Sequence, residues 1–249
     1  MNDQPSPVRL RRFYVPPAVF ASEILRFEAR ESHHIATVLR LAPGTRVTVF
    51  DGRAEAEAEL IDVSDAAVTA RRVGTVRVST RPMVITLLQG VARGPKMDLI
   101  VRTATEIGVS VIAPVVTSRS LANPGPARCD RWRRIAREAA RQCGRPDIPH
   151  VEPAAPLPRA LETMAPSDIF LVPWEHERRL VGSVLAGRRV GSAVVLIGPE
   201  GGLTDAEVAA ARGVGGQTVS LGPLILRTET AGLVTVAMLV YEGILRPSD

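Results

Sequence analysis

The sequence predicts a two-domain protein of the α/β class. Residues 81–249 are expected to form a mostly parallel sheet with helices on both faces, and residues 1–80 a small β-barrel. Three observations support this division. Continuous apolar runs recur after residue 82, as in strands buried on both faces. Segments of helical periodicity separate these runs. Before residue 80, apolar and polar residues alternate between Asp-Gly and Pro-Gly turns, which favours antiparallel strands.

The N-terminal region contains short alternating runs. Residues 46–50 are closed by Asp51-Gly52, residues 54–61 carry Glu at every second position from 55 to 59, and two shorter runs follow at 67–70 and 75–78. One helix is expected near residues 32–39, with Ser32 as its N-cap. The pattern predicts a small antiparallel barrel or sandwich that ends near residues 79–82.

The C-terminal region alternates strands with helices. Apolar runs occupy residues 83–88, 111–116, 169–172, 193–197 and 218–221. Between them, one amphipathic helix ends at Gly108 and another at Gly144, both as C-caps. Thr204 and Glu207 form a capping box that starts a third helix. In such folds, ligands bind outside the carboxyl ends of the strands.

Composition excludes several classes of protein. The chain has 31 Lys and Arg against 26 Asp and Glu, and Lys96 is its only lysine. Arginine suits phosphate and stacked bases, although a solvated surface explains the same excess. The two cysteines and four scattered histidines predict neither disulfides nor a metal site. The N-terminal residues lack the apolar core of a signal peptide, and no segment approaches about 18 consecutive apolar residues. The chain is therefore expected to be a soluble cytoplasmic protein.

Three loops follow three of these predicted strands, at residues 173–175, 197–202 and 221–231, and in a parallel sheet all three gather at one edge. The second is glycine-rich, yet it lacks the Lys-Ser/Thr of a phosphate-binding loop and the spacing of a dinucleotide site. The third supplies an apolar slot through Leu221, Leu224, Ile225 and Leu226, which favours a flat heterocycle. The alternative is that residues 221–226 are simply a buried turn.

Two segments carry a family resemblance. GPEGGLTDAEV at 198–208, followed by LGPLILRTETA at 221–231, closely resembles the ribosomal RNA small subunit methyltransferase E family, within the SPOUT class of RNA methyltransferases. The likeness extends to residues 34–40, 50–52, 96–98, 105–109 and 137–145, and so covers nearly the whole chain. The paired segments in this order are specific, whereas either alone is weaker.

The resemblance implies a PUA-like barrel that helps to bind RNA and a SPOUT domain with a deep trefoil knot that dimerises. It also implies methyl transfer from S-adenosyl-L-methionine to N3 of a uridine in the 16S rRNA of the small ribosomal subunit. The cofactor-binding residues that it implies are Val172, Pro173, Ile197, Gly198, Glu200, Gly202, Leu221, Gly222, Leu224, Leu226 and Thr230.

Two residues are candidates for catalysis. Arg227 stands where a cation would stabilise a uracil that has lost its N3 proton, and Glu229 is a candidate base or an orienting partner for Arg227. Alternatively, Arg227 binds phosphate and Glu229 provides charge at a helix N-terminus. Glu200 is expected near the ribose or the cationic end of the cofactor, or else as a structural partner of an arginine.

Basic residues outside the loops are candidates for contact with RNA. The alternative for each single residue is that it is a solvated surface charge with no binding role. The RNA-binding candidates are Arg9, Arg11, Arg12, His34, Arg40, Lys96 and Arg145. The last helix, at about residues 230–245, is apolar on most of its faces. Its own sheet covers one of these faces and a second subunit would cover another, so we expect a homodimer. Two further hypotheses remain: a SPOUT enzyme for another RNA or for a ribose 2′-OH, and a non-catalytic RNA-binding assembly factor.

Overall fold

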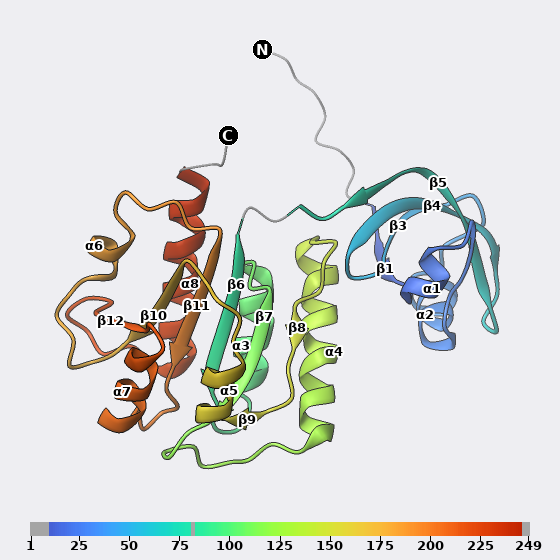
Figure 1. The fold of residues 1–249 in the computed structure, drawn as a ribbon. Coiled ribbons are helices and arrows are strands. Elements are labelled where there is room, and N and C mark those ends of the chain that lie inside the picture. The colour runs from blue at the N-terminus through green and yellow to red at the C-terminus, as the bar shows by residue number, and fades with distance from the viewer. Residues whose placement is uncertain (1–9, 81–82, 246–249) are drawn as a thin grey trace. The chain divides into compact units, whose positions relative to one another are not determined.

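The structure is a computed structural model that describes residues 10–80 and 83–245 (Figure 1). The chain divides into two compact units. The first contains residues up to Ser79 together with Ala140–Ile148, and the second contains Thr80–Ala139 and the residues from Pro149 onward. The N-terminal unit thus includes a segment from within the span predicted as the second domain.

The N-terminal unit is built on a five-stranded sheet in the order β1-β3-β4-β5-β2, in which only the β1–β3 pair is parallel. Burial alternates along β4, with the alanines inward and Glu55, Glu57 and Glu59 less buried. The two short runs predicted at 67–70 and 75–78 belong to one strand, β5. Its elements are β1 (Arg12–Tyr14), α1 (Pro17–Phe20), β2 (Ile24–Arg26), α2 (Ala29–His33), the π-helix η1 (His34–Val38), β3 (Arg46–Phe50), β4 (Ala54–Val63) and β5 (Val68–Val78).

The prediction that Ser32 caps a helix was wrong. The N-cap of α2 is Glu28, and Ser32 lies inside the helix with a fully buried side chain. Its hydroxyl donates to the Phe27 carbonyl at 3.3 Å and accepts from the Val68 amide at 3.1 Å. A pattern of residue types does not distinguish a serine that caps a helix from one whose hydroxyl accepts a hydrogen bond from the backbone amide of a neighbouring strand.

The C-terminal unit is an all-parallel sheet in the order β12-β10-β11-β6-β7-β8, with β9 also paired to β7. All five predicted apolar runs form strands in it. Two-residue strands and short helices were not predicted, because they show no period. Its elements are β6 (Val84–Gly90), α3 (Lys96–Glu106), β7 (Val111–Val116), α4 (Pro126–Cys143, whose last four residues join the first unit), β8 (His150–Val151), β9 (Ala155–Pro156), α5 (Leu157–Thr163), β10 (Ile169–Pro173), α6 (Val181–Leu185), β11 (Ser192–Ile197), α7 (Asp205–Gly213), β12 (Gln217–Val219) and α8 (Thr228–Leu245).

Helices cover both faces of this sheet, which explains the continuous apolar runs. On one face, Leu88, Val194 and Leu196 pack in a single cluster with residues of α5 and α7. On the other face, α8 contacts β11, β6 and α3 (Figure 1). Each strand therefore buries alternate side chains against different helices. Among the described residues, no helix is both long enough and apolar enough to cross a membrane.

The first prediction concerns Ser32. Ser32→Ala leaves the Val68 amide buried without an acceptor, so we expect the unfolding free energy of the N-terminal unit to fall by about 1–3 kcal/mol. Urea unfolding followed by circular dichroism, with hydrogen exchange at the Val68 amide, measures the loss. Ser22→Ala, at an exposed position, is the matched control, and an equal effect of both changes would contradict the assignment.

Candidate functional site

Three loops meet where three neighbouring parallel strands end. β10 lies between β12 and β11 in the sheet, so the segments after Val219, Pro173 and Ile197 leave the same edge. The Trp174 amide donates to the Val219 carbonyl at 3.0 Å, and the Ser220 amide donates to the Arg179 carbonyl at 2.7 Å. The loop that follows β10 is therefore tied to the loop that follows β12.

Two adjoining hollows lie among these loops. The larger has a volume of about 550 Å³ and the smaller about 380 Å³, and they share six lining residues, including Pro173, Trp174 and Leu226. We call the first the leucine pocket, because Leu180, Leu221, Leu224 and Leu226 line it. We call the second the glycine pocket, because Gly198, Gly201 and Gly202 line it. Together they form one cleft of the size that holds a small organic ligand.

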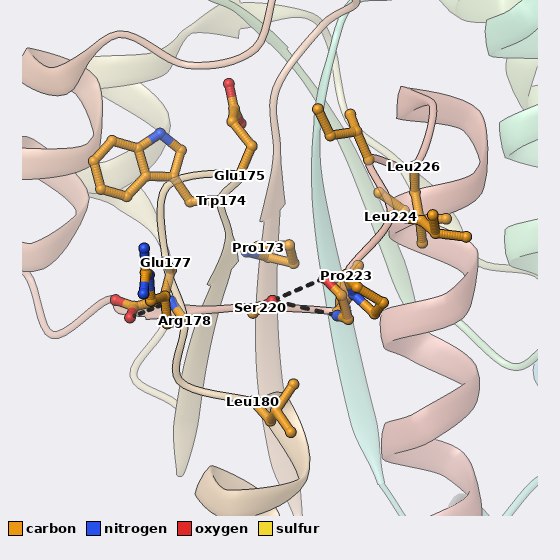
Figure 2. A pocket seen from close by; sticks show the side chains of 14 residues that line it. Pro173, Trp174, Glu175, Glu177, Arg178, Leu180, Ser220, Pro223, Leu224 and Leu226 are labelled. Atoms are coloured by element: carbon orange, nitrogen blue, oxygen red, sulfur yellow. Dashed lines mark hydrogen bonds between the residues drawn. The ribbon is translucent and has the colours of Figure 1, made fainter.

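The leucine pocket presents apolar side chains to solvent. Figure 2 shows Leu224 and Leu226 on the α8 side and Trp174 and Glu177 opposite them. Leu224 is 76 % and Ile225 86 % exposed, which is unusual for such residues unless a ligand or partner covers them. Gly222 allows this loop geometry with a φ of +126°, and its amide donates to the Ser220 hydroxyl at 3.3 Å.

Close backbone approach shapes the glycine pocket. A Cβ on Gly90, at the end of β6, would lie 2.5 Å from the Pro199 nitrogen, and one on Gly198 would lie 2.8 Å from the Gly202 carbonyl carbon. Gly202 itself has a φ of +71°. Only glycine permits such contacts, because any side chain would force the turn open. The glycines are therefore required by the packing of the turn against β6 and against itself.

Two side chains fix the turn from outside. Arg119, in the loop after β7, donates through Nη1 to the Gly201 carbonyl at 2.7 Å. On the other side, the Thr228 hydroxyl donates to the Gly198 carbonyl at 2.6 Å, while Gln89 Nε2 donates to Thr228 at 3.0 Å. Thr228 is the first residue of α8, so this contact also fixes the position of Arg227.

A lysine lies between two carboxylates at the rim of the glycine pocket. Lys96 Nζ is 3.1 Å from Glu200 Oε1 and 3.4 Å from Glu229 Oε2. The hydrogen bond with Glu200 is the main cause of the raised pKa of Lys96. Burial opposes ionisation of Glu200, but the Arg93 amide, its own amide and Lys96 outweigh it and lower the pKa of Glu200. This rim therefore carries two carboxylates and one ammonium.

The far side of the leucine pocket holds a second charged network. The Thr218 hydroxyl donates to Glu177 at 2.6 Å and accepts from Arg212 at 2.7 Å. Thr218, followed by the Arg179 and Arg178 amides, lowers the pKa of Glu177 to about 2, with Arg212 adding a smaller effect. The Arg212 guanidinium also lies 5.5 Å from the centre of the Trp174 ring. Trp174 is thereby held in place at the junction of the two hollows.

Comparison with known proteins identifies the family. A family model described as an RNA methyltransferase domain matches residues 79–240, and one described as an RNA methyltransferase PUA domain matches residues 27–71. The ribosomal RNA small subunit methyltransferase E of Bacillus subtilis is 31 % identical over 232 residues, covering 88 % of this chain and 90 % of that protein. The chain belongs to the ribosomal RNA small subunit methyltransferase E family.

Solved structures agree with this methyltransferase E assignment. The Neisseria gonorrhoeae methyltransferase E bound to S-adenosyl methionine has a TM-score of 0.84 and 31 % identity, covering 92 % of this chain and 96 % of that one. A putative methyltransferase from Legionella pneumophila, in complex with the cofactor SAM, has a TM-score of 0.83 and 28 % identity, covering 93 % and 97 %. The expected fold class, a SPOUT α/β domain with a PUA-like domain, is confirmed.

Most residues expected to bind the methyltransferase cofactor line the cleft. Val172 is fully buried in the core, whereas Thr230 is exposed on the first turn of α8, and neither is among the residues that line the two hollows. The expected residues that line the cleft are Pro173, Ile197, Gly198, Glu200, Gly202, Leu221, Gly222, Leu224, Leu226 and Arg227, together with Lys96.

The charged partners differ from those expected from the sequence. Glu229 faces Lys96, and among the residues that the structure describes Arg227 has no ion pair, so Glu229 does not orient Arg227 here. Glu200 also pairs with Lys96, and among the described residues an arginine contacts it only through a backbone amide, that of Arg93. Sequence spacing places these residues in one loop cluster but does not show which of them face each other.

The residues expected to bind RNA are found in several places. One hollow of the N-terminal unit is lined by Arg11, Arg12 and His34. Arg40 does not line this hollow, and its side chain is exposed to solvent. Arg145 pairs with Asp147 at 2.5 Å, and both side chains are nearly buried. Arg9 lies outside the described residues. On α4, Arg131 binds Asp98 through two nitrogens, and Arg133 pairs with Asp130, so those two arginines are bonded within the protein.

Sequence reasoning missed two contributors to the methyltransferase cleft. Arg119 follows the predicted strand at 111–116 and so lies at the carboxyl edge of the sheet, which was a usable signal. The link from Glu177 through Thr218 to Arg212 joins positions on three different elements, and no local pattern marks it. Within the described part of the chain, no group of three or more His, Cys, Asp or Glu is placed to hold a metal ion.

The second prediction concerns Glu177, whose folded pKa lies below its ordinary value of 4.5. The folded state favours the ionised carboxylate of Glu177. The stabilisation that this carboxylate provides is therefore present above pH 4.5 and is lost as the pH falls toward 2. Glu177→Gln should therefore flatten the dependence of the unfolding free energy on pH across that window. Chemical denaturation at a series of pH values tests this, with exposed Glu162→Gln as the control, and identical slopes for Glu177→Gln and wild type would refute it.

Proposed function

We propose that the protein transfers a methyl group from S-adenosyl-L-methionine to N3 of a uridine in the 16S rRNA of the small ribosomal subunit. The observation that carries this proposal is the two-part cleft at the edge of β12, β10 and β11, in a chain of the methyltransferase E family. Two solved structures similar to this chain contain the same methyl donor.

The residues present fit this donor. The exposed Leu224 and Ile225, with Leu180, would cover the adenine ring in the leucine pocket, and the backbone of the three loops offers amides and carbonyls to the edge of the ring. The glycine pocket, with carboxylates but no phosphate-binding loop, suits the cationic end of a sulfonium amino acid. Glu175 and Glu200 are the carboxylates that line it.

The donor, when bound, supplies an electrophilic methyl group whose former bonding pair stays on sulfur as the thioether forms. The protein must align the uracil and remove the proton from N3. Arg227, at the mouth of the glycine pocket and without an ion pair among the described residues, would stabilise the negative charge that develops on the uracil carbonyls. Glu229 would accept the N3 proton, and its Oε2 pairs with Lys96 Nζ at 3.4 Å.

The N-terminal unit would hold the RNA. It matches an RNA methyltransferase PUA domain, and its candidate contacts are Arg11, Arg12, His34 and Arg40. Binding that depends on arginine–phosphate contacts weakens as salt rises. We place the activity in the cytoplasm, where the ribosomal subunits are.

We also propose that the protein acts as a homodimer through α8. Ala237 and Tyr241 are exposed on this helix, with Tyr241 62 % exposed, although the described helix is strongly apolar. Covering such a face with a second copy removes apolar surface from water.

The function is tested directly by incubating the protein with labelled S-adenosyl-L-methionine and small subunits from cells that lack this modification. We expect label on one uridine, and mapping of the methylated atom separates N3 from a ribose 2′-OH. If the protein binds S-adenosylhomocysteine but transfers no label, the enzymatic proposal fails and a non-catalytic RNA-binding role replaces it.

The third prediction concerns Arg227. Arg227→Ala should lower the rate of methyl transfer on the order of 100-fold or more, because a charge-stabilising donor is lost in the transition state. The affinity for S-adenosylhomocysteine, measured by calorimetry, should change little. Arg102→Ala, an exposed position on α3, is the control. Comparable losses of transfer and of affinity would assign Arg227 to binding instead.

The fourth prediction concerns the oligomer. Sedimentation velocity at micromolar concentration should show a species of twice the 26.7 kDa chain mass. Tyr241→Asp should shift the population toward the monomer, because it places a charge in the proposed interface. Val78→Asp, at a position 69 % exposed in the N-terminal unit, is the matched control. A single 26.7 kDa species for the wild-type protein would refute the dimer.

A further inference from the structure

A third hollow lies within the N-terminal unit. It has a volume of about 320 Å³, and three arginines line it: Arg11 and Arg12 at β1, and Arg141 in the last turn of α4. We call it the arginine hollow. None of its lining residues lines the leucine pocket or the glycine pocket.

The arginine hollow is positively charged and partly apolar. Its eight lining residues include three arginines but no carboxylate. His34 and Gln142 add hydrogen-bonding groups, and Leu39 contributes an apolar wall. A bare anion would need only the cations. A wall that combines cations, an amide and apolar side chains suits a group that has both a charged part and a flat ring.

Arg12 is held rigidly at this wall. Its side chain is only 10 % exposed and pairs with Glu55 at 2.5 Å, while Nη2 donates to the Arg145 carbonyl at 3.2 Å. Its guanidinium carbon also lies 5.1 Å from the centre of the Phe50 ring. Nevertheless, Nε is buried and has no hydrogen-bond partner in the described part of the chain. A buried donor left without a partner is costly, and this one belongs to a residue that lines the hollow.

The backbone beside the arginine hollow is unusual. His34 begins the π-helix η1, and Leu39 is its C-cap. The next residue, Arg40, has a φ of +50° and is the only residue other than glycine with a positive φ in the described part of the chain. π-helical turns and left-handed residues without a compensating glycine cost energy, and they occur preferentially at binding sites.

We propose that the arginine hollow binds one nucleotide of the substrate RNA, distinct from the nucleotide that is methylated. Arg11 and Arg141 would contact its phosphate, the base would lie against Leu39 and the His34 ring, and the Gln142 amide would reach the base edge. This inference rests on the proposed function for the identity of the RNA. It adds a second, separate point at which a particular nucleotide is held.

Two variants test the arginine hollow in different ways. Gln142→Trp fills it without changing charge, and Arg11→Ala removes its exposed cation. The probe is a labelled fragment of 16S rRNA, with affinity measured by fluorescence anisotropy over a series of salt concentrations. Arg71→Ala, an exposed arginine on β5 outside the hollow, is the control for loss of one positive charge.

We expect Gln142→Trp and Arg11→Ala each to weaken RNA binding on the order of ten-fold, and Arg71→Ala to weaken it less than two-fold. Arg11→Ala should also reduce the salt slope by about 0.7, the value for one phosphate contact in single-stranded RNA. Gln142→Trp should leave the slope unchanged, because it removes no cation. Circular dichroism checks folding, and Gln142→Glu, which introduces an anion into the hollow, replaces Gln142→Trp if the larger side chain prevents folding.

Two results would overturn the proposal. The first is RNA affinity for the hollow variants equal to that of Arg71→Ala. The second is loss of activity on assembled subunits with unchanged affinity for naked RNA, which would assign the hollow to a protein partner. Calorimetry with S-adenosylhomocysteine, which should be unaffected by these variants, keeps the two proposals separate. If the wild-type protein binds no S-adenosylhomocysteine, the proposed function fails while the RNA measurements still decide the role of the hollow.

Discussion

The cleft depends on the contact between the glycine turn after β11 and the start of α8. The Thr228 hydroxyl bonds to the Gly198 carbonyl at 2.6 Å, and a side chain on Gly90 would collide with Pro199. These contacts fix the turn between β6 and α8, so they also set the shape of the glycine pocket and the position of Arg227. A turn held on one side only would leave both hollows undefined.

Around this contact, charge and apolar surface are separated. The leucine pocket exposes Leu224 and Ile225, whereas the rim of the glycine pocket carries Lys96 between Glu200 and Glu229. One ammonium balances part of the charge of two carboxylates, so the rim remains favourable for a cation. Arg227 lies beside this rim but is not neutralised by it. Such an arrangement serves a reaction in which a cationic donor and a uracil that becomes anionic must meet in one cleft.

The arginine-rich composition has more than one physical role. Arg131, Arg133 and Arg145 are bonded within the protein, and Arg119 supports the glycine turn. Arginine suits these positions because its planar group binds two acceptors at once. Arg12 is also paired within the protein, with Glu55, yet it lines the arginine hollow together with Arg11 and Arg141, and no carboxylate lines that hollow. The net charge of the chain does not distinguish these roles. The location of each guanidinium group in the structure distinguishes them.

The sequence by itself determined the class of fold, five strands of the parallel sheet and the loops that line the cleft. Those features depend on local periods and on glycine, proline and capping residues, which act within a few positions along the chain. Only the tertiary structure decided that the Ser32 hydroxyl accepts from the Val68 amide, that Lys96 pairs with Glu200 and Glu229, and that residues 140–148 join the N-terminal unit. These pairings join residues that are distant in sequence, and their partners are selected by burial and side-chain geometry, which no local period encodes.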